Sequence, residues 1–302
     1  MKAAVLHGPD RVPAYEDFAD PAPAAGEIVV DVLAASLHHL TRGHALGKHY
    51  SSHGQFPSIP GVDGVGRRPD GQLIYFGGVR APYGTFAERA ATRGGLPLPA
   101  GLDPQRAAAM MNAAASSWLA LSCRAPIEAG ATVLVVGATG ASGSLALQIA
   151  RHLGATRVIA VGRRRDALAA LHPDAALTPD DKDALVAEFA RGVDVVLDYV
   201  WGAPAQAMFA AIMAAHSPKR LRYVNIGALA GDAQVHPHLL RSLPIELLGS
   251  GIGSVSQAQW AHELPRILAA LPAFTLRFDP VPLADVAAAW QREGGDRVVI
   301  VP

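Results

Sequence analysis

A glycine-spaced turn between an apolar run and a helix-forming run is the part of the sequence best suited to binding a phosphate. Residues 133–136 are four apolar residues in a row, and Gly137, Gly140 and Gly143 follow them. Such a run favours a strand buried on both faces, Gly140 lets the backbone approach a pyrophosphate, and Gly143 lets the next helix pack closely against the sheet. Helix N-terminal amides would then bind the phosphates. Although such a pattern can also be a plain tight turn, we predict a coenzyme site at Gly137, Thr139, Gly140, Ala141, Ser142 and Gly143.

A cluster of arginines after the next apolar run indicates which dinucleotide binds. The run at 158–161 is followed by Gly162, Arg163, Arg164 and Arg165, and Arg163 lies 20 residues beyond Gly143. At that place a site selective for NAD carries a carboxylate for the ribose 2′-hydroxyl, whereas guanidinium groups pair with a 2′-phosphate. We therefore predict NADPH rather than NADH. The alternative is that the arginines form the solvated start of a helix.

The composition excludes several other classes of protein. The 302 residues suffice for two domains, half of them are hydrophobic, and 26 Lys and Arg balance 26 Asp and Glu. No overall field therefore attracts nucleic acid. Cys123 is the single cysteine, which excludes an internal disulfide framework. The sequence contains no secretory signal and no apolar run long enough for a membrane span, so we expect a cytoplasmic protein without membrane contact.

The elements that must position these residues change in kind along the chain. Residues 1–108 contain short apolar strands such as 27–34 and 73–76 among many prolines and glycines, and predict an irregular β domain. A helix is expected after Asp103, a plausible N-cap with Pro104 at the first helical position, running through Leu121. Residues 109–256 then alternate strands and helices, which predicts a parallel doubly wound sheet; the strands are expected at 133–136, 158–161, 193–197, 221–226 and 245–248.

The last residues change the pattern again. We expect a helix at 257–271, a strand at 274–278, a short helix at 283–291 and a strand at 298–301. These elements in 257–302 could either return to the first domain or extend the sheet of the second.

Seven segments together resemble the zinc-independent quinone oxidoreductase branch of the medium-chain dehydrogenase/reductase superfamily, nearly from end to end. They are Met-Lys-Ala-Ala-Val at 1–5, Gly-Glu-Ile-Val-Val at 26–30, Pro-Gly-Val-Asp-Gly-Val-Gly at 60–66, Tyr-Gly-Thr-Phe-Ala-Glu at 83–88, the glycine turn at 137–143, Val-Asp-Val-Val-Leu-Asp at 193–198 and Asp-Arg-Val-Val-Ile-Val-Pro at 296–302. The resemblance implies an α/β protein with a GroES-like β domain, a Rossmann doubly wound parallel-sheet domain that binds the coenzyme, and a cleft between the two. It also implies a homodimer formed by pairing of Rossmann sheet edges. Residues 245–250 are similar to that edge strand, with an interior strand as the alternative.

The same resemblance leaves no place for a catalytic zinc ion. Zinc-dependent relatives carry Cys where this sequence has His38, and His-Glu where it has Val62 and Asp63. We therefore predict no metal site. The nearby His39, His44, His49 and His53 show no compact ligand spacing, although adventitious metal binding at this loop is the alternative.

Further site residues follow only from the resemblance, and each has a structural alternative. His38 stands where the family usually has Asn facing the nicotinamide, and Thr41 where it usually has Asp. His38 is therefore a candidate catalytic donor, or a loop histidine satisfied by backbone. Tyr50, the second catalytic candidate, could orient a carbonyl oxygen or only pack. The remaining predictions are Ser116 beneath the nicotinamide or bonded to its own helix, Asn225, Gly227, Gly249 and Ser250 at strand ends that line the coenzyme, and Arg292 at the adenosine phosphate or in solvent.

The predicted reaction is hydride transfer from NADPH to a quinone. The hydroquinone anion that forms is stabilised by conjugation and can take a proton from water, so no strong protein acid is required. The alternative acceptor is an activated C=C bond in an enal, enone or enoyl thioester, where a protonating group such as Tyr50 or His38 matters more. A second alternative is a nucleotide-binding protein without turnover, suggested by the shortened stretch at 66–75.

Overall fold

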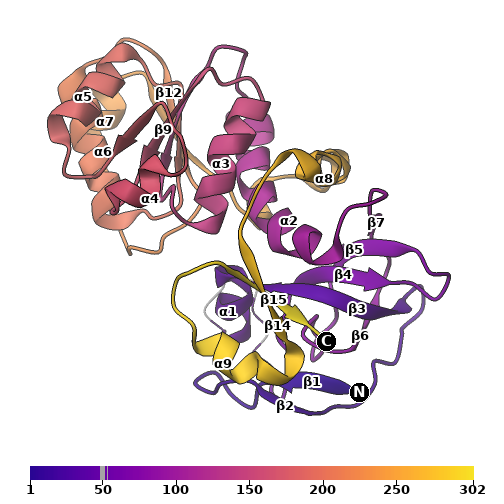
Figure 1. Cartoon of the computed structure of the whole chain (residues 1–302). Coiled ribbons are helices and arrows are strands. Elements are labelled where there is room, and N and C mark those ends of the chain that lie inside the picture. Colours follow the sequence, from indigo (N-terminus) through magenta and orange to yellow (C-terminus); the bar gives the residue numbers. More distant parts are fainter. Residues whose placement is uncertain (48–51, 53) are drawn as a thin grey trace. The chain divides into compact units, whose positions relative to one another are not determined.

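The structure is a computed structural model that describes residues 1–47, 52 and 54–302. The chain divides into two compact units (Figure 1). The first unit contains Met1–Asn112 and Leu268–Pro302, and the second contains Ala113–Ile267. The break in the first unit means that its core is assembled from both ends of the chain.

The first unit is built mainly from β-strands. One sheet has the strand order β14-β15-β3-β4-β5-β7, with β6 paired to β3, and β1 and β2 form a second, antiparallel sheet. The elements are β1 (Lys2–Val5), β2 (Ala14–Asp17), β3 (Ile28–Leu37), α1 (His39–Ala45), β4 (Asp63–Arg67), β5 (Leu73–Gly77), β6 (Arg89–Thr92), β7 (Leu96–Pro97), β14 (Phe278–Pro282), α9 (Val286–Gln291) and β15 (Arg297–Val301).

The C-terminal strands belong to the sheet of the first unit. β15 runs antiparallel to β3, with Ile300 opposite Ala35, and Ile300 is buried among residues from β1, β3 and α9. Of the two alternatives for residues 257–302, this pairing selects the return to the first domain for the final strands. The helix α8 (Gln257–Ala270) lies before them and belongs mostly to the second unit.

The strand expected at residues 274–278 is wrong. A short 3₁₀ turn at Leu271–Ala273 precedes Phe274, which is 2% exposed, and the strand is β14, four residues later. Pro280 and Pro282 lie within β14. Proline is tolerated because β14 is an edge strand that pairs only with β15.

The second unit contains a fully parallel sheet of six strands in the order β10-β9-β8-β11-β12-β13. The predicted strands are all present, with ends shifted by one or two residues. The additional strand, β10, was missed because its three residues, Ala-Ala-Leu, give no strand signal. Helix α2 (Pro104–Leu119) begins in the first unit and ends in the second. The other elements of the second unit are β8 (Thr132–Val136), α3 (Ala141–His152), β9 (Arg157–Val161), α4 (Arg165–Ala169), β10 (Ala175–Leu177), α5 (Lys182–Arg191), β11 (Val195–Asp198), α6 (Gly202–Ala215), β12 (Leu221–Asn225), α7 (Pro237–Ser242) and β13 (Ile245–Gly249).

Alternate residues of β8 pack on opposite faces of this sheet. Val133 and Val135 join a core that includes residues of α3, whereas Leu134 and Val136 join a core that includes residues of α5 and α6. Figure 1 shows α3 on one side of the strands and α5 and α6 on the other. The continuous apolar run therefore has the predicted cause, which is burial on both faces.

Helix α2 begins where the sequence predicts. The backbone N–H of Arg106 donates to the Asp103 carboxylate at 2.7 Å, which is the expected capping bond, and Pro104 is the first helical residue. The helix continues into a π-helical turn at Ala120–Arg124, where Ala125 N–H donates to the Ala120 carbonyl at 2.7 Å.

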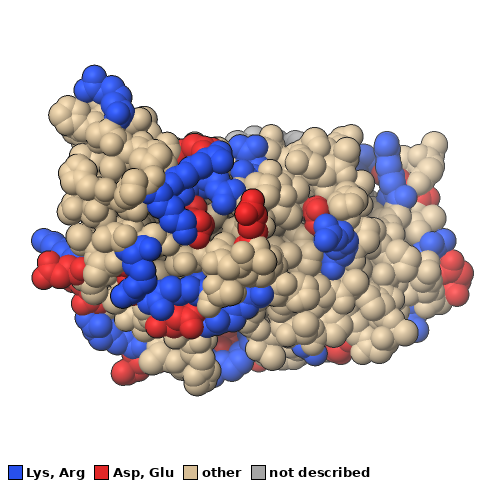
Figure 2. Space-filling model, turned by 90° about the horizontal axis from the view of Figure 1, so that it is seen from above, with Lys and Arg blue, Asp and Glu red and all other residues tan. Residues whose placement is uncertain are grey.

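Charged side chains are mixed on the surface. Figure 2 shows Lys and Arg lying beside Asp and Glu on one face of the molecule. Ion pairs such as Arg157–Glu188 at 2.7 Å and Lys219–Asp194 at 2.7 Å follow the same pattern. Attraction of an anionic ligand must therefore come from local groups.

Candidate functional site

The strand order of the second unit locates a candidate ligand site. The chain moves outward from β8 to β9 and β10 on one side, and from β11 to β13 on the other, so the order reverses between β8 and β11. Ligands of such sheets bind beyond the carboxyl ends of the strands at this reversal. Gly137 directly follows β8 and Tyr199 directly follows β11.

The glycine turn after β8 has the geometry of a phosphate-binding turn. Gly137 has φ of 86°. A Cβ atom on Gly143 would lie 2.3 Å from the Gly137 carbonyl oxygen, so the close packing of α3 on the turn requires glycine there. A Cβ atom on Gly140 would meet only the Gly137 oxygen, at 3.5 Å. The protein itself leaves the space beside Gly140 open, which fits close approach by a ligand.

The N-terminus of α3 offers donors to that space. Gly140 is the N-cap residue and supplies no side-chain capping bond. Within the described residues, no acceptor bonds the backbone N–H groups of Ala141, Ser142 and Gly143. Thr139, Ala141 and Ser142 are partly exposed, and Gly140 is exposed. Free amides at a helix N-terminus of this kind suit a pyrophosphate.

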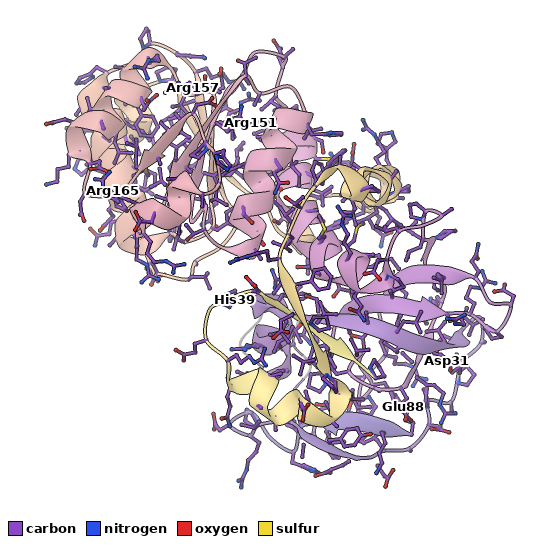
Figure 3. All side chains as sticks on the ribbon, in the orientation of Figure 1. Asp31, His39, Glu88, Arg151, Arg157 and Arg165 are labelled. Carbon is purple, nitrogen blue, oxygen red and sulfur yellow. The ribbon has the colours of Figure 1, made fainter. Side chains whose placement is uncertain are left out.

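The arginine cluster after β9 divides into two free side chains and one paired side chain. Arg165, labelled in Figure 3, forms an ion pair with Asp181. The backbone amide of Thr178 and this guanidinium lower the pKa of the Asp181 carboxyl. Arg163 and Arg164 are exposed and form no ion pair with any described residue. Gly162 N–H donates to the Leu177 carbonyl at 3.1 Å, which ties the start of the cluster to β10.

Ser116 contacts both its own helix and the reversal point. Its hydroxyl donates to the Ala113 carbonyl at 2.7 Å, as expected for the structural alternative, and its oxygen lies 3.2 Å from the Tyr199 phenol. The two possibilities proposed for Ser116 are therefore compatible.

The end of β12 lies next to Tyr199, and the end of β13 lies beside that of β12. A Cβ atom on Gly227 would lie 2.5 Å from the Tyr199 carbonyl oxygen, so the chain requires glycine here. The Asn225 side chain donates to the Gly227 carbonyl at 2.9 Å, and Ser250 N–H donates to the Asn225 carbonyl at 2.8 Å. Gly249 is exposed, and its carbonyl accepts from Arg124 at 2.8 Å. These residues thus gather at the carboxyl edge of one sheet.

His38 lies in the first unit, where both of its ring nitrogens have partners. Its Nδ1 accepts from Thr41 N–H at 3.1 Å and so caps α1, and its Nε2 lies 3.0 Å from Asp63 Oδ1. Because Nδ1 is the acceptor, Nε2 carries the proton and donates to the carboxylate. The ring is only 5% exposed. This geometry fits the alternative in which His38 is satisfied within its own surroundings.

Asp63 connects His38 to a second buried group. Its Oδ2 accepts from the Tyr75 phenol at 2.5 Å. Burial and the charge of Asp63 raise the pKa of Tyr75 well above its usual value. Burial lowers the pKa of the nearby Arg297 to about 10, against the opposing attraction of Asp63. Where zinc-dependent relatives carry metal ligands, this chain has a hydrogen-bonded polar cluster, and residues 1–47, 52 and 54–302 contain no group of three His, Cys, Asp or Glu that could hold a metal ion.

Two remaining predictions concern Tyr50 and the C-terminal arginine. Tyr50, His49 and His53 lie outside the described residues. Arg292 is in the first unit, where its guanidinium pairs with Asp279 and its carbonyl accepts from Arg42 at 2.8 Å.

Sequence reasoning missed Tyr199, Asp63 and Tyr75 as site residues. Tyr199 had a usable signal, because it directly follows a predicted strand of a doubly wound sheet. The pairing of Asp63 with Tyr75 had none, because it depends on the register of β4 against β5.

Three features together define a coenzyme-binding oxidoreductase of the medium-chain dehydrogenase/reductase architecture. They are a parallel sheet whose strand order reverses between β8 and β11, the glycine turn, and the separate β unit. The chain is 31% identical to the probable NADPH-dependent quinone reductase of Emericella nidulans, over 96% of each chain. It therefore belongs to the quinone oxidoreductase branch of that superfamily.

Solved structures agree with this assignment. The quinone oxidoreductase of Thermus thermophilus, solved alone and with NADPH, matches with a TM-score of 0.81 and 29% identity over 100% of each chain. A probable oxidoreductase of Mycobacterium abscessus matches with a TM-score of 0.83 and 26% identity, covering 100% of this chain and 99% of that one.

Part of a much larger protein also matches. The chain is 32% identical over 84% of its length to a mycocerosic acid synthase-like polyketide synthase of Mycobacterium tuberculosis, of which the match spans 12%. No family model matches the chain. Among the described residues, no helix has the length and apolar character that crossing a membrane requires.

Proposed function

We propose that this protein is an NADPH-dependent oxidoreductase that transfers hydride to a quinone-type acceptor without a metal ion. The observation that carries the proposal is the pair of exposed, unpaired guanidinium groups of Arg163 and Arg164 beside the glycine turn. The name of the Emericella nidulans relative and the NADPH complex of the Thermus thermophilus enzyme support it.

In this proposal the residues of the chain bind and orient. NADPH, when bound, supplies the hydride. The amides at the start of α3 bind its pyrophosphate, and Arg163 and Arg164 bind the 2′-phosphate. Gly162 and Arg165 shape the site of the 2′-phosphate. The opposite end of the coenzyme site is lined by Ser116, Asn225, Gly227, Gly249 and Ser250. Because a hydroquinone anion can be protonated by water, the reaction does not depend on a proton from His38.

The proposal includes a cytoplasmic homodimer. β13 is the edge strand of its sheet, so the alternative of an interior strand is wrong. An edge strand has unpaired backbone groups available for another strand.

The first prediction tests the 2′-phosphate contact. Replacing Arg163 and Arg164 by alanine should weaken NADPH binding about 10²- to 10⁴-fold, because each of the two charge-assisted hydrogen bonds contributes roughly 1.5–3 kcal/mol and about 1.4 kcal/mol is tenfold. NADH binding should change little. Calorimetry with both coenzymes measures the preference.

Arg191→Ala is the matched control, since Arg191 is an exposed arginine of the same unit that pairs with Glu188. It should leave both affinities unchanged. An unaltered preference for NADPH in the double variant would contradict the assignment.

Reduction of an activated C=C bond is the second candidate. The match to a polyketide synthase keeps enoyl thioesters among the acceptors to be assayed. Parallel assays with benzoquinones, alkenals and enoyl thioesters decide between the candidates, and Tyr50→Phe and His38→Ala test whether either residue supplies a proton. C=C reduction should fall in these variants more than quinone reduction.

Binding without turnover is the third candidate. The shortened stretch at 66–75, which suggested this candidate, contains the β4–β5 connection. This connection is a short turn in which Arg68 N–H donates to the Gln72 carbonyl at 2.9 Å. Tight NADPH binding without oxidation across this panel of acceptors would favour it.

A further inference from the structure

Tyr199 occupies the reversal point of the sheet, where its side chain packs against the core that contains residues of β8, α3 and β11. Its backbone N–H donates to the Val136 carbonyl at 3.2 Å, which joins the ends of β8 and β11. A Cβ atom added to Gly137 would lie 3.5 Å from the Cβ atom of Tyr199. The residue is only partly buried. A ligand seated on the glycine turn would therefore lie next to this side chain.

The direction of the Tyr199–Ser116 hydrogen bond follows from the available protons. Ser116 has one hydroxyl proton, and that proton goes to the Ala113 carbonyl at 2.7 Å. Across the 3.2 Å contact, Tyr199 must therefore donate and Ser116 accept. The phenol oxygen has two lone pairs, and the nearby Ser117 hydroxyl can occupy only one of them, so one is left for another donor.

The phenol also remains neutral at ordinary pH. Burial raises the pKa of Tyr199 to about 12, although the serine hydroxyls act in the opposite direction. A neutral phenol that already donates its proton is an acceptor for an N–H group.

The strand order indicates which end of a dinucleotide reaches Tyr199. Arg163 and Arg164 follow β9, the glycine turn follows β8, and Tyr199 follows β11, on the opposite side of β8 from β9. A coenzyme with its 2′-phosphate at the arginines and its pyrophosphate at the turn extends its nicotinamide half towards β11.

We propose that Tyr199, held in place by Ser116, is a coenzyme-positioning residue whose phenol oxygen accepts a hydrogen bond from the nicotinamide carboxamide. This inference rests on the proposed function. It adds a residue that orients the reacting ring, and it makes Ser116 the support of Tyr199.

The test compares a whole coenzyme with its adenosine half. Calorimetry measures binding of NADPH and of 2′,5′-ADP to the wild type, Tyr199→Phe, Ser116→Ala and Arg163→Ala. Tyr199→Phe should weaken NADPH binding about 3- to 10-fold, the range expected for one neutral hydrogen bond. It should leave 2′,5′-ADP binding unchanged, which also shows that the variant is folded. Ser116→Ala should have the same pattern, whereas Arg163→Ala should weaken both ligands.

Tyr15→Phe is the matched control, because Tyr15 is 41% exposed on β2. It should alter neither affinity. Equal NADPH affinities of the wild type and Tyr199→Phe overturn the inference alone, as does an equal loss of both ligands. Wild-type binding without turnover overturns the proposed reaction and leaves the inference standing, whereas wild-type protein that binds neither ligand overturns both.

Discussion

Asp63 has a structural function at a position where zinc-dependent relatives carry a metal ligand. Its two carboxylate oxygens accept from His38 at 3.0 Å and from Tyr75 at 2.5 Å, and it is 6% exposed. The bond to His38 orients a ring that caps α1. The cluster therefore links β4, β5 and the start of α1.

Asp63→Asn should destabilise the protein by about 1.5–3 kcal/mol, the range for a hydrogen bond to a charged group. The amide has one oxygen acceptor, and its NH₂ group would face one of the two donors. Urea unfolding measures the loss. Asp10→Asn, at an exposed position, is the control. A change below about 0.5 kcal/mol, the usual range for surface substitutions, would show that the cluster adds little.

Tyr199 predicts a dependence of stability on alkaline pH. Its pKa is raised from 10.0 to about 12 in the folded protein. The stabilisation from the neutral phenol is therefore complete below pH 10 and is lost as the pH rises from about 10 to about 12. The free energy of unfolding of the wild type relative to Tyr199→Phe should decrease over this interval. A constant difference between pH 8 and pH 12 would be inconsistent with the buried phenol.

At the scale of elements, the turn between β8 and α3 assigns different functions to two glycines. A Cβ atom on Gly143 would lie 2.3 Å from the Gly137 oxygen, whereas one on Gly140 would have only a 3.5 Å contact with it. Gly143 serves packing, and we assign Gly140 to ligand approach. A pair of alanine variants separates these functions.

Gly143→Ala should lower the free energy of unfolding by about 1–3 kcal/mol through overpacking. Gly140→Ala should leave it nearly unchanged, because Gly140 has an ordinary φ of −75°. NADPH binding should weaken in both variants. Thermal unfolding and calorimetry measure the two effects, and full NADPH affinity in Gly140→Ala would refute close approach at that residue.

At the scale of the whole molecule, the first unit closes only when both ends of the chain are present. β15 is an interior strand between β14 and β3, and Trp290 from α9 is buried against residues of β1 and β3. Truncation before β14 should therefore unfold the first unit.

The edge position of β13 carries the prediction of a homodimer. Light scattering after size-exclusion chromatography should give twice the 31.4 kDa mass of the chain. A mass of one chain at all concentrations would contradict the dimer.

The sequence by itself determined five of the six strands of the parallel sheet, the glycine turn, the capped start of α2 and the family, because each of these depends on short patterns of residues. The tertiary structure decided the rest. It placed β13 and the proline-containing β14 at sheet edges, gave His38 its partners at Asp63 and Thr41, and joined Ser116 to Tyr199. Most of these features depend on contacts between residues far apart in the chain. The residues of a strand do not by themselves determine which of its edges remains unpaired.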